Sequence, residues 1–247
     1  MLKNLLKWAG QRLLTLNTYL FLFSWLAGWR LRKTDYDPEF RHFLGLIPQE
    51  GIILDIGANI GIMTVALAKA KPGCSVYAFE PAPPNLGALR RIIAWHHLTN
   101  VKVFPVALGE IAGDATILLP EVNAVLMPGL SHIVEPGLPP AKGQSFAVRM
   151  ERLDGILQTS DDRKVVALKL DVENYEYFVL KGGRELLQRD LPLIYCELWA
   201  DDRRDACIGL LTEMGYTPKL FAQGRLIPYE HQPSINLFFI PPAVQSL

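Results

Sequence analysis

Four charged side chains are crowded into one short segment of the sequence: Lys169, Asp171, Glu173 and Glu176. Lys169 lies near the end of the apolar run 165–170, and the other three follow it. The run has the character of a strand buried on both faces. Lys169 and Asp171 lie two residues apart and so share one face of that strand. Charges at the end of a buried strand are costly unless they are paired or used. The segment therefore predicts either a proton-transfer site or a structural network of the lysine with its carboxylates.

If the segment is a proton-transfer site, Asp171 and Glu173 are the candidate bases, and Lys169 orients or neutralises them. His132 is a further candidate base, because the ordinary pKa of histidine suits proton transfer near neutral pH. It belongs to the segment 129–132 of a region rich in proline and glycine. The alternative for a single histidine in such a region is a bystander role.

The segment 55–61 has the residues of a ligand-binding turn. Gly57 lets the backbone turn sharply and approach a ligand, because no Cβ is in the way. Asn59 tolerates a left-handed conformation, and Gly61 allows a helix to pack closely on a strand. Asp55 lies at the strand end, where it can attract an ammonium group. Ligand binding is favoured over a purely structural turn because the segment joins a strand to a helix.

Glu80 and Pro81 follow the next apolar run, 75–79. An acid about 20 residues beyond a glycine turn can accept hydrogen bonds from a ribose diol, which fits NAD or S-adenosylmethionine. The first turn lacks the second glycine of Gly-x-Gly-x-x-Gly, so an NAD-dependent oxidoreductase is disfavoured. The alternative for Glu80 is an acid that interacts with a helix dipole.

Strand and helix patterns alternate from residue 51 onward. Helical spacing is seen at 60–70, 84–95, 175–187 and 203–214; strands are expected at 52–56, 75–79, 101–106, 165–170, 193–198, 217–221 and 235–240. This alternation predicts an α/β fold with a mostly parallel sheet covered on both faces. The last two strands have no helix between them and suggest a hairpin that turns near Gln223 and Gly224.

The region 109–149 interrupts this alternation with five prolines and several glycines. Its ends, 115–119 and 146–150, have strand character. A long insertion in a compact domain is usually either functional or disordered. We expect a loop over the active site, with disorder as the alternative.

The overall charge is zero, because 25 basic side chains balance 25 acidic ones among the 247 residues. This balance excludes a global basic field for nucleic acid. The distribution is uneven, however. The first 34 residues carry six basic and no acidic side chains, and the remainder carries 19 basic and 25 acidic ones. The chain thus divides into a basic head, 1–34, and an acidic body, 35–247.

The head is expected to form an amphipathic helix over 1–33, with apolar residues at spacings of three and four. Its longest uncharged stretch, 13–29, is at the short limit for a membrane span, and no signal-peptide cleavage pattern follows. One interpretation is a peripheral helix on the inner face of a membrane, with its basic residues at anionic headgroups. The other is an ordinary helix that packs on the body or on a second subunit, as in a homodimer.

The spacing of the cysteines and histidines bears on disulfides, metal sites and the redox environment. The three cysteines are widely spaced and form no Cys-x-x-Cys pair, and the five histidines show no metal-ligand spacing. These patterns predict no disulfide framework, no metal and a reducing, cytoplasmic environment.

The ordered set of motifs resembles the FkbM family of S-adenosylmethionine-dependent methyltransferases. The resemblance rests on ILDIGANIGIMTVALA (53–68), YAFEPAPPN (77–85), VALGE (106–110), LKLDVENYEYFVLKGG (168–183), CELW (196–199) and MGYTP (214–218). It implies a Rossmann-like class I methyltransferase fold, with seven strands in the order 3-2-1-4-5-7-6 and strand 7 antiparallel. It also implies an enzyme rather than a binding protein.

The resemblance further implies which residues contact S-adenosylmethionine. The turn would hold the methionine part of the cofactor, Glu80 the ribose hydroxyls, and the 106–108 region the adenine. The implied cofactor contacts are therefore Asp55, Gly57, Ala58, Asn59, Gly61, Glu80, Pro81, Ala107, Leu108 and Asp171. One position departs from the family pattern, because Asn174 replaces a glycine. Asparagine also tolerates a left-handed conformation.

The expected reaction is O-methylation of a hydroxyl on a small molecule, such as a sugar, a glycolipid or other lipid-linked acceptor, or a secondary metabolite. The alternative, given Asn174, is a catalytically silent relative that acts as a binding module at a membrane. A nucleic-acid methyltransferase is disfavoured by the acidic body and by the lack of a motif for a flipped base.

Overall fold

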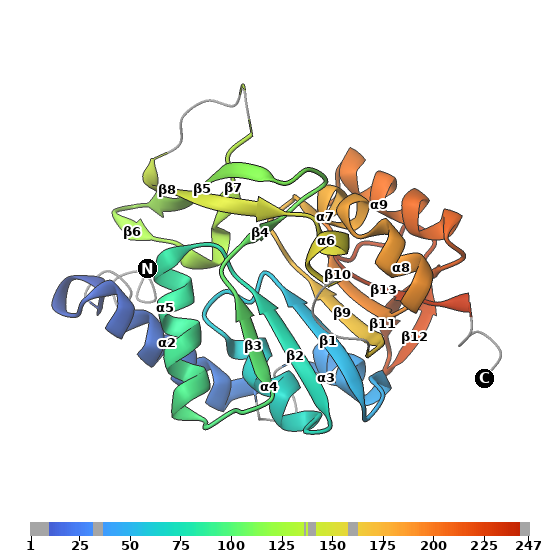
Figure 1. The fold of residues 1–247 in the computed structure, drawn as a ribbon, viewed down its shortest axis with the longest axis horizontal. Helices are drawn as coiled ribbons and strands as arrows, with labels where there is room; N and C mark the ends of the chain where they lie inside the picture. The colour runs from blue at the N-terminus through green and yellow to red at the C-terminus, as the bar shows by residue number, and fades with distance from the viewer. Residues whose placement is uncertain (1–9, 32–36, 136, 138–141, 158–162, 243–247) are drawn as a thin grey trace.

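The computed structural model describes residues 10–31, 37–135, 137, 142–157 and 163–242. Its central sheet has eight strands in the order β3-β2-β1-β9-β10-β13-β11-β12 (Figure 1). The strands are β1 (Gly51–Ile56), β2 (Cys74–Phe79), β3 (Val101–Phe104), β9 (Val165–Leu170), β10 (Leu193–Glu197), β11 (Thr217–Ala222), β12 (Arg225–Pro228) and β13 (Asn236–Ile240). β13 runs antiparallel to both of its neighbours, β10 and β11. The α/β prediction is confirmed.

The expected number of strands is wrong by one. The turn at Gln223 and Gly224, where both residues have positive φ, joins β11 to the extra edge strand β12 and not to β13. β12 is short and half exposed, so its sequence carries little apolar pattern. β13 then returns to lie between β10 and β11, where it is almost completely buried.

Helices cover both faces of this sheet, as predicted. One face packs against α6 (Leu153–Leu157), α7 (Glu176–Gly182), α8 (Arg184–Asp190) and α9 (Asp202–Glu213). The other packs against α3 (Pro38–Leu46) and α4 (Ile62–Ala70), with α5 (Pro83–Trp95) beside β2 and β3. Side chains alternate along β1, so Ile52, Leu54 and Ile56 join the first core. Ile53 joins the second core, and Asp55 therefore points to the side of α4.

The single helix expected over 175–187 is two helices. α7 ends and α8 begins at Gly182 and Gly183. A Cβ on Gly182 would come within 2.0 Å of the Gly109 carbonyl oxygen, so the chain needs glycine where this helix passes the insertion. The helical pattern of the sequence continues through this break and does not reveal it.

The described part of the insertion forms a second sheet and not the loop expected over 109–149, but it lies over the strand ends, as expected. This sheet consists of β4 (Ala107–Leu108), β5 (Gly113–Val122), β6 (Val125–Leu126), β7 (His132–Ile133) and β8 (Gly143–Glu151), with a short 3-10 helix η1 (Pro128–Leu130). The predicted strands 115–119 and 146–150 lie inside β5 and β8, which pair antiparallel. Gly113 and Gly143 begin β5 and β8, and Pro128 begins η1. In Figure 1 this sheet lies above the ends of β1, β2 and β3.

In the head, the structure shows α2 (Leu16–Leu31) beside α5 (Figure 1). Leu20 is buried against Ile60 and Ala88, and the Ser24 hydroxyl donates to the Ile60 carbonyl at 2.7 Å. Of the two interpretations of the head, packing on the body holds for this segment. The expected amphipathic stripe is absent from α2, because apolar side chains also occupy its exposed side. Much of the basic charge of the head, Lys3, Lys7, Arg32 and Lys33, lies outside the described residues. Within the described residues, no helix is long and apolar enough to cross a membrane.

Candidate functional site

The turn after β1 passes very close to the end of β9. Gly57 has φ +76°, and a Cβ there would come within 1.8 Å of the Asp171 carbonyl oxygen, so glycine is required. The backbone N–H groups of Gly57 and Ala58 both donate to the Phe79 carbonyl. Asn59 has φ +51°, the left-handed conformation that its residue type allows. The turn is thus fixed to both neighbouring strands.

Glu80, directly after β2, is buried at the base of a cavity. Its carboxylate accepts hydrogen bonds from the backbone N–H groups of Asn59 and Ala82, both at 2.8 Å, and from the Asn85 amide at 3.4 Å. Burial nevertheless outweighs these donors and raises the pKa of Glu80 to about 7. Since a carboxylate has about four acceptor positions, Glu80 retains room for a further donor.

Lys169 connects the ends of β1 and β9. Its ammonium group donates to the Gly57 carbonyl at 3.0 Å and lies 3.3 Å from the Asp171 carboxylate and 3.7 Å from that of Asp55. Burial lowers the pKa of Lys169, but Asp171 and Asp55 outweigh burial, so that this pKa is above its ordinary value. The Thr64 hydroxyl donates to Asp55 at 2.6 Å. The structural network, one of the two alternatives for this segment, is therefore present, and the Asp171 carboxylate within it stays partly exposed.

Glu173 lies outside the helix α7, which begins at Glu176. Glu173 and Asn174 both have positive φ, in a bend that precedes α7. Burial, together with the charges of Asp171, Glu197 and Glu176, raises the pKa of Glu173 to about 8. Glu176 is buried and accepts from the Val172 N–H at 2.9 Å, which makes it part of the bend's support. Asn174 therefore takes the left-handed position that glycine would occupy.

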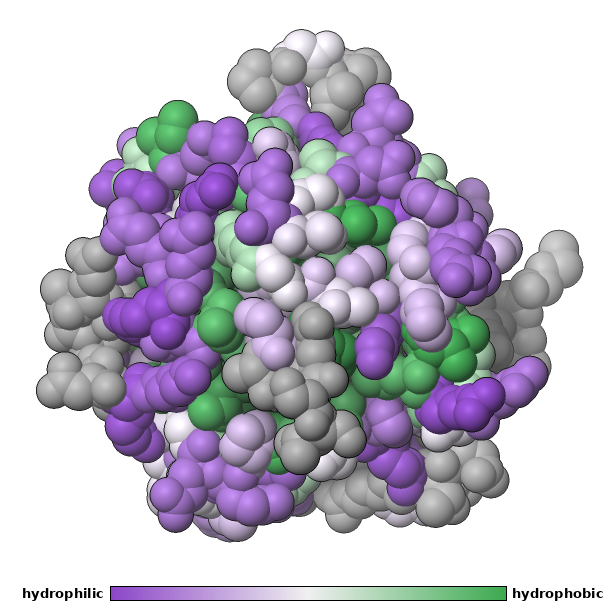
Figure 2. Space-filling view, turned by 90° about the vertical axis from the view of Figure 1, so that its right-hand side faces the viewer, coloured by the Kyte–Doolittle hydropathy of each residue, from purple (hydrophilic) through white to green (hydrophobic). Residues whose placement is uncertain are grey.

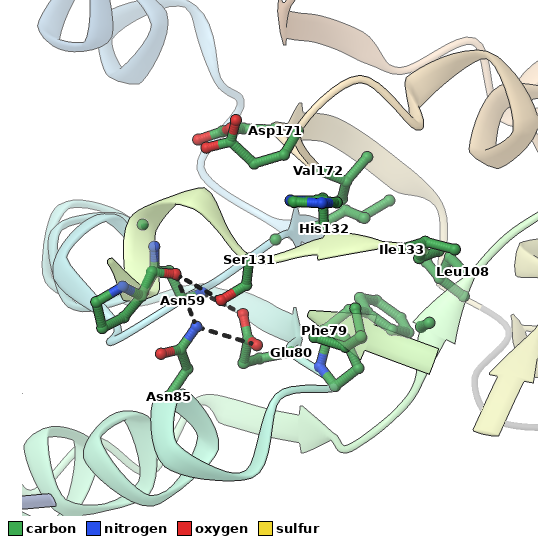
Figure 3. Close-up of a pocket in the computed structure, with 18 of the residues that line it drawn as sticks. Asn59, Phe79, Glu80, Asn85, Leu108, Ser131, His132, Ile133, Asp171 and Val172 are labelled. Atoms are coloured by element: carbon green, nitrogen blue, oxygen red, sulfur yellow. Dashed lines mark hydrogen bonds between the residues drawn. The ribbon is translucent and has the colours of Figure 1, made fainter. Parts of the chain in front are cut away.

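These elements line an open cavity between the ends of β1, β2 and β9 and the insertion. In Figure 3, Glu80 and Asn85 lie on one side of it, and Asp171 and His132 on the other. Phe79, Leu108 and Ile133 give it an apolar end. The predicted residues that line it are Gly57, Asn59, Glu80, Pro81, Ala107, Leu108, His132, Asp171 and Glu173.

Two predicted cofactor contacts are placed behind the cavity wall. Asp55 is fully buried and does not line this cavity, because Thr64 and Lys169 cover its carboxylate. Gly61 packs against Leu89 and Ile92 of α5, where a Cβ would come within 2.8 Å of either side chain. Both residues therefore support the turn from behind. Ala58 and Lys169 face a second cleft, on the other side of Asp171.

The insertion brings the predicted residue His132 to the site, together with Ser131, which the sequence analysis did not single out. Ser131 lines the cavity, and its hydroxyl donates to the Pro128 carbonyl, which also accepts from Asn85 at 3.3 Å. The Nδ1 of His132 lies 2.9 Å from the Leu130 carbonyl and must donate to it, so the neutral ring presents Nε2 as its acceptor. Asn85, in the first turn of α5, also lines the site; its place shortly after Glu80 in the sequence was a signal that could have identified it.

Taken together, the sheet order, the antiparallel β13 and a cavity beyond the carboxyl ends of β1 and β2 define a class I methyltransferase fold. Residues 55–218 match the family model for the methyltransferase FkbM domain. The chain belongs to the FkbM methyltransferase family.

Proteins of similar sequence that are named as methyltransferases support this assignment. The 31-O-demethyl-FK506 methyltransferase FkbM of Streptomyces tacrolimicus is 30% identical over 200 residues, which cover 72% of this chain and 76% of the relative. Methyltransferase 1 of Beauveria bassiana is 30% identical over 55% of this chain, and methyltransferase sdnD of Sordaria araneosa is 31% identical over 51%. The matches span 59% and 46% of these two relatives' own lengths.

The crystal structure of methyltransferase FkbM from Methylobacillus flagellatus KT shares the fold. Its TM-score is 0.54 at 19% identity, and the match covers 79% of this chain and 45% of that one. S-adenosylmethionine is the cofactor of this family.

The residues present fit this cofactor. The Oδ1 atoms of Asn59 and Asn85 are buried at the cavity without a hydrogen-bond partner, and Glu80 can accept a further hydrogen bond. The apolar end beside Leu108 suits a flat aromatic base. Among the described residues, no group of three or more His, Cys, Asp or Glu side chains could hold a metal ion.

Proposed function

We propose that the chain is an S-adenosylmethionine-dependent O-methyltransferase that acts on a hydroxyl of a sugar, a glycolipid or a secondary metabolite. One observation carries the proposal: Asp171 lines both the cavity that contains Glu80 and the second cleft. A carboxylate between a cofactor site and an acceptor site is placed where a hydroxyl proton must be removed.

The cofactor would be held by residues of the first cavity. Glu80 would accept from the ribose hydroxyls, and Asn59 would present its free amide oxygen to the methionine part. The segment 106–108 and Ile133 would border the adenine. When bound, S-adenosylmethionine supplies a methyl group on a positively charged sulfur, which makes transfer to an oxygen nucleophile favourable.

Asp171 is the proposed base, and Lys169 is its positioning partner. The pKa of Glu173, about 8, leaves this group mostly protonated at neutral pH, so it can hold a proton but accepts one poorly. His132 faces the same cavity and is the second candidate, with Nε2 as its accepting atom. A base contributes about 10²–10⁴-fold to the rate of such a reaction.

The competing function is a silent binding module that retains the fold without turnover. Calorimetric titration with S-adenosylmethionine tests the cofactor site, and an assay of methyl transfer separates the two functions. Cofactor binding without transfer to any host lipid, glycan or metabolite would favour the binding module. No cofactor binding would contradict both.

We also propose that the exposed side of α2 contacts an anionic membrane surface. Leu22, Trp25, Leu26 and Trp29 are each more than 40% exposed, and Trp95 of α5 continues this apolar surface through its ring contact with Phe21. Exposed basic side chains flank it, namely Arg30, Arg90 and Arg91. The molecule's other end, with α8, α9 and β12, shows a largely hydrophilic rim (Figure 2). A cytoplasmic enzyme bound to a membrane in this way, alone or as a homodimer, would be near lipid-linked acceptors.

A further inference from the structure

A second cleft lies on the other side of Asp171 from the Glu80 cavity. It is bounded by α2, by the turn after β1, by the start of α4 and by the segment 126–130 of the insertion. Four different parts of the chain therefore build it, and none of them forms it alone.

Most of its wall is hydrocarbon. The side chains that form this wall include Tyr19, Phe23, Met63, Leu126, Met127 and Leu130. A sugar ring against such a wall would lose hydrogen bonds to water without replacement, which is costly. A hydrocarbon chain there would leave water at no such cost.

Three polar side chains of the cleft lie where it meets the cofactor cavity, and a fourth, Asp37, lines the cleft but not that cavity. Lys169, Asp171 and Asn59 line the cleft, and Asn59 and Asp171 also line the Glu80 cavity. Lys169 is 5% exposed, and the buried Oδ1 of Asn59 has no hydrogen-bond partner. The cleft thus offers hydrogen-bonding groups beside the cofactor cavity and a wall that is otherwise largely apolar, apart from Asp37, whose carboxylate accepts from the Phe40 N–H.

The head is fastened in place as one of these walls. The side-chain amide of Gln11 donates to the Leu126 carbonyl at 2.9 Å and accepts from the Leu126 N–H at 3.0 Å. Gln11 therefore joins the head to β6 as a neighbouring strand would. Together with the bond from Ser24 of α2 to Ile60, this contact ties the head to the body at two points, one before α2 and one within it.

We infer that this cleft binds the methyl acceptor, and that the acceptor is an amphiphilic alcohol. Its hydroxyl lies at Asp171, and its hydrocarbon body lies along α2 and the insertion. The reaction itself rests on the proposed function, whereas the binding of an alkyl alcohol does not. The head, in this assignment, determines specificity in addition to any contact with a membrane.

The test is calorimetric titration of the full-length protein, without cofactor, with 1-butanol, 1-hexanol and 1-octanol. Affinity should rise about three- to fourfold for each added methylene, as expected for transfer of a CH₂ group out of water. Glycerol, which has no alkyl chain, should not bind. An affinity independent of chain length would overturn the inference.

Two variants test whether the alcohol lies against α2. Phe23→Gln should weaken the binding of 1-octanol about tenfold, because an aromatic wall is lost. Leu22→Gln is the matched control, since Leu22 is exposed to a similar degree, 44% against 41%, but does not line the cleft. Ala27→Trp, which fills the cleft, should also weaken binding; circular dichroism checks that each variant is folded.

Equal affinity of Phe23→Gln and Leu22→Gln for 1-octanol, with Ala27→Trp unchanged, would overturn the inference. These titrations involve no methyl transfer, so their failure is distinct from that of the proposed function. If the alkanols bind as expected but S-adenosylmethionine does not bind, the proposed function fails and the apolar cleft remains a binding site.

Discussion

The ammonium group of Lys169 lies 3.3 Å from the carboxylate of Asp171, and the two residues differ sharply in exposure. The side chain of Lys169 is 6% exposed, whereas that of Asp171 is 34% exposed. The buried partner is fixed by Gly57 and Asp55, and the exposed partner faces two cavities. The buried Lys169 therefore holds the carboxylate of Asp171, which we propose as the base, in a fixed position at the end of the sheet.

Removal of the charge of Lys169 tests this arrangement. Lys169→Met should lower the free energy of unfolding by about 3–5 kcal/mol, because the fully buried Asp55 loses its counter-ion. Urea denaturation measures this change. The control is Lys181→Met, which breaks the surface ion pair with Glu110 and should change stability little. Equal effects of the two substitutions would show that the buried network is not structural.

The raised pKa of Glu80 predicts a pH-dependent cofactor affinity. Hydroxyl donors favour the ionised carboxylate, so the affinity for S-adenosylmethionine should rise as the pH increases through about 7 and then level off. Below that pH, Glu80 must lose a proton on binding. Titration calorimetry across this range measures the effect. In Glu80→Gln the dependence should vanish and the affinity should be low; a wild-type affinity independent of pH would contradict the ribose assignment.

Because the backbone at Gly57 lies so close to Asp171, one added methyl group at this position should lower the stability of the protein. Gly57→Ala should cost more than about 1 kcal/mol, since the new Cβ meets the Asp171 carbonyl and φ is positive. It should also weaken cofactor binding. Gly45→Ala, in α3 where a Cβ would meet no other atom within 4 Å, should be neutral or stabilising by about 0.5–1 kcal/mol. Thermal unfolding compares the two variants; equal melting temperatures would contradict the close approach.

Replacement of Asn174 by glycine, the usual residue of the family at this position, should leave the stability unchanged or raise it slightly. Its φ of +70° costs a residue with a Cβ about 1–2 kcal/mol relative to glycine, with asparagine among the least affected. Asn174→Gly should therefore keep methyl transfer and match or exceed the wild-type stability, whereas Asn174→Ala should be less stable. The carbonyl of residue 174 still accepts from Arg203 in both variants. A large loss of activity in Asn174→Gly would show that the amide itself is needed.

The proposed membrane contact calls for point substitutions, because α2 also builds the cleft and its deletion would disturb the body. Trp25→Gln should reduce sedimentation with vesicles that contain phosphatidylserine. Trp199→Gln is the control, since Trp25 and Trp199 are 45% and 46% exposed. Equal sedimentation of both variants and the wild type would show that α2 does not contact the membrane.

The sequence was sufficient for those parts of the fold and site that depend on local patterns. Apolar runs followed by an acid located β1, β2 and β9 and placed Glu80 and Asp171 at strand ends, because parallel strands bring their carboxyl ends together. The left-handed conformation of Asn59 follows from its residue type. These features need no knowledge of distant contacts.

Features that depend on distant pairing could not be predicted. Gln11 contacts Leu126 across 115 positions, and nothing in either segment's composition indicates this pair. β5 and β8 carry proline and glycine at their ends, which locally resemble a loop, and only their mutual pairing makes them a sheet. The burial of Asp55 likewise depends on the packing of α4, since its position along the strand alone suggested a ligand contact.

Transfer of a labelled methyl group tests the central claim most directly. Full-length protein is incubated with S-adenosylmethionine, labelled in its methyl group, and with a lipid and metabolite extract of the host; the label in extracted products is then counted. The wild type should label an alcohol in the extract, and Asp171→Ala should do so about 10²–10⁴-fold more slowly while it still binds the cofactor. Equal transfer by the wild type and Asp171→Ala, or no transfer by either with the cofactor bound, would contradict the account.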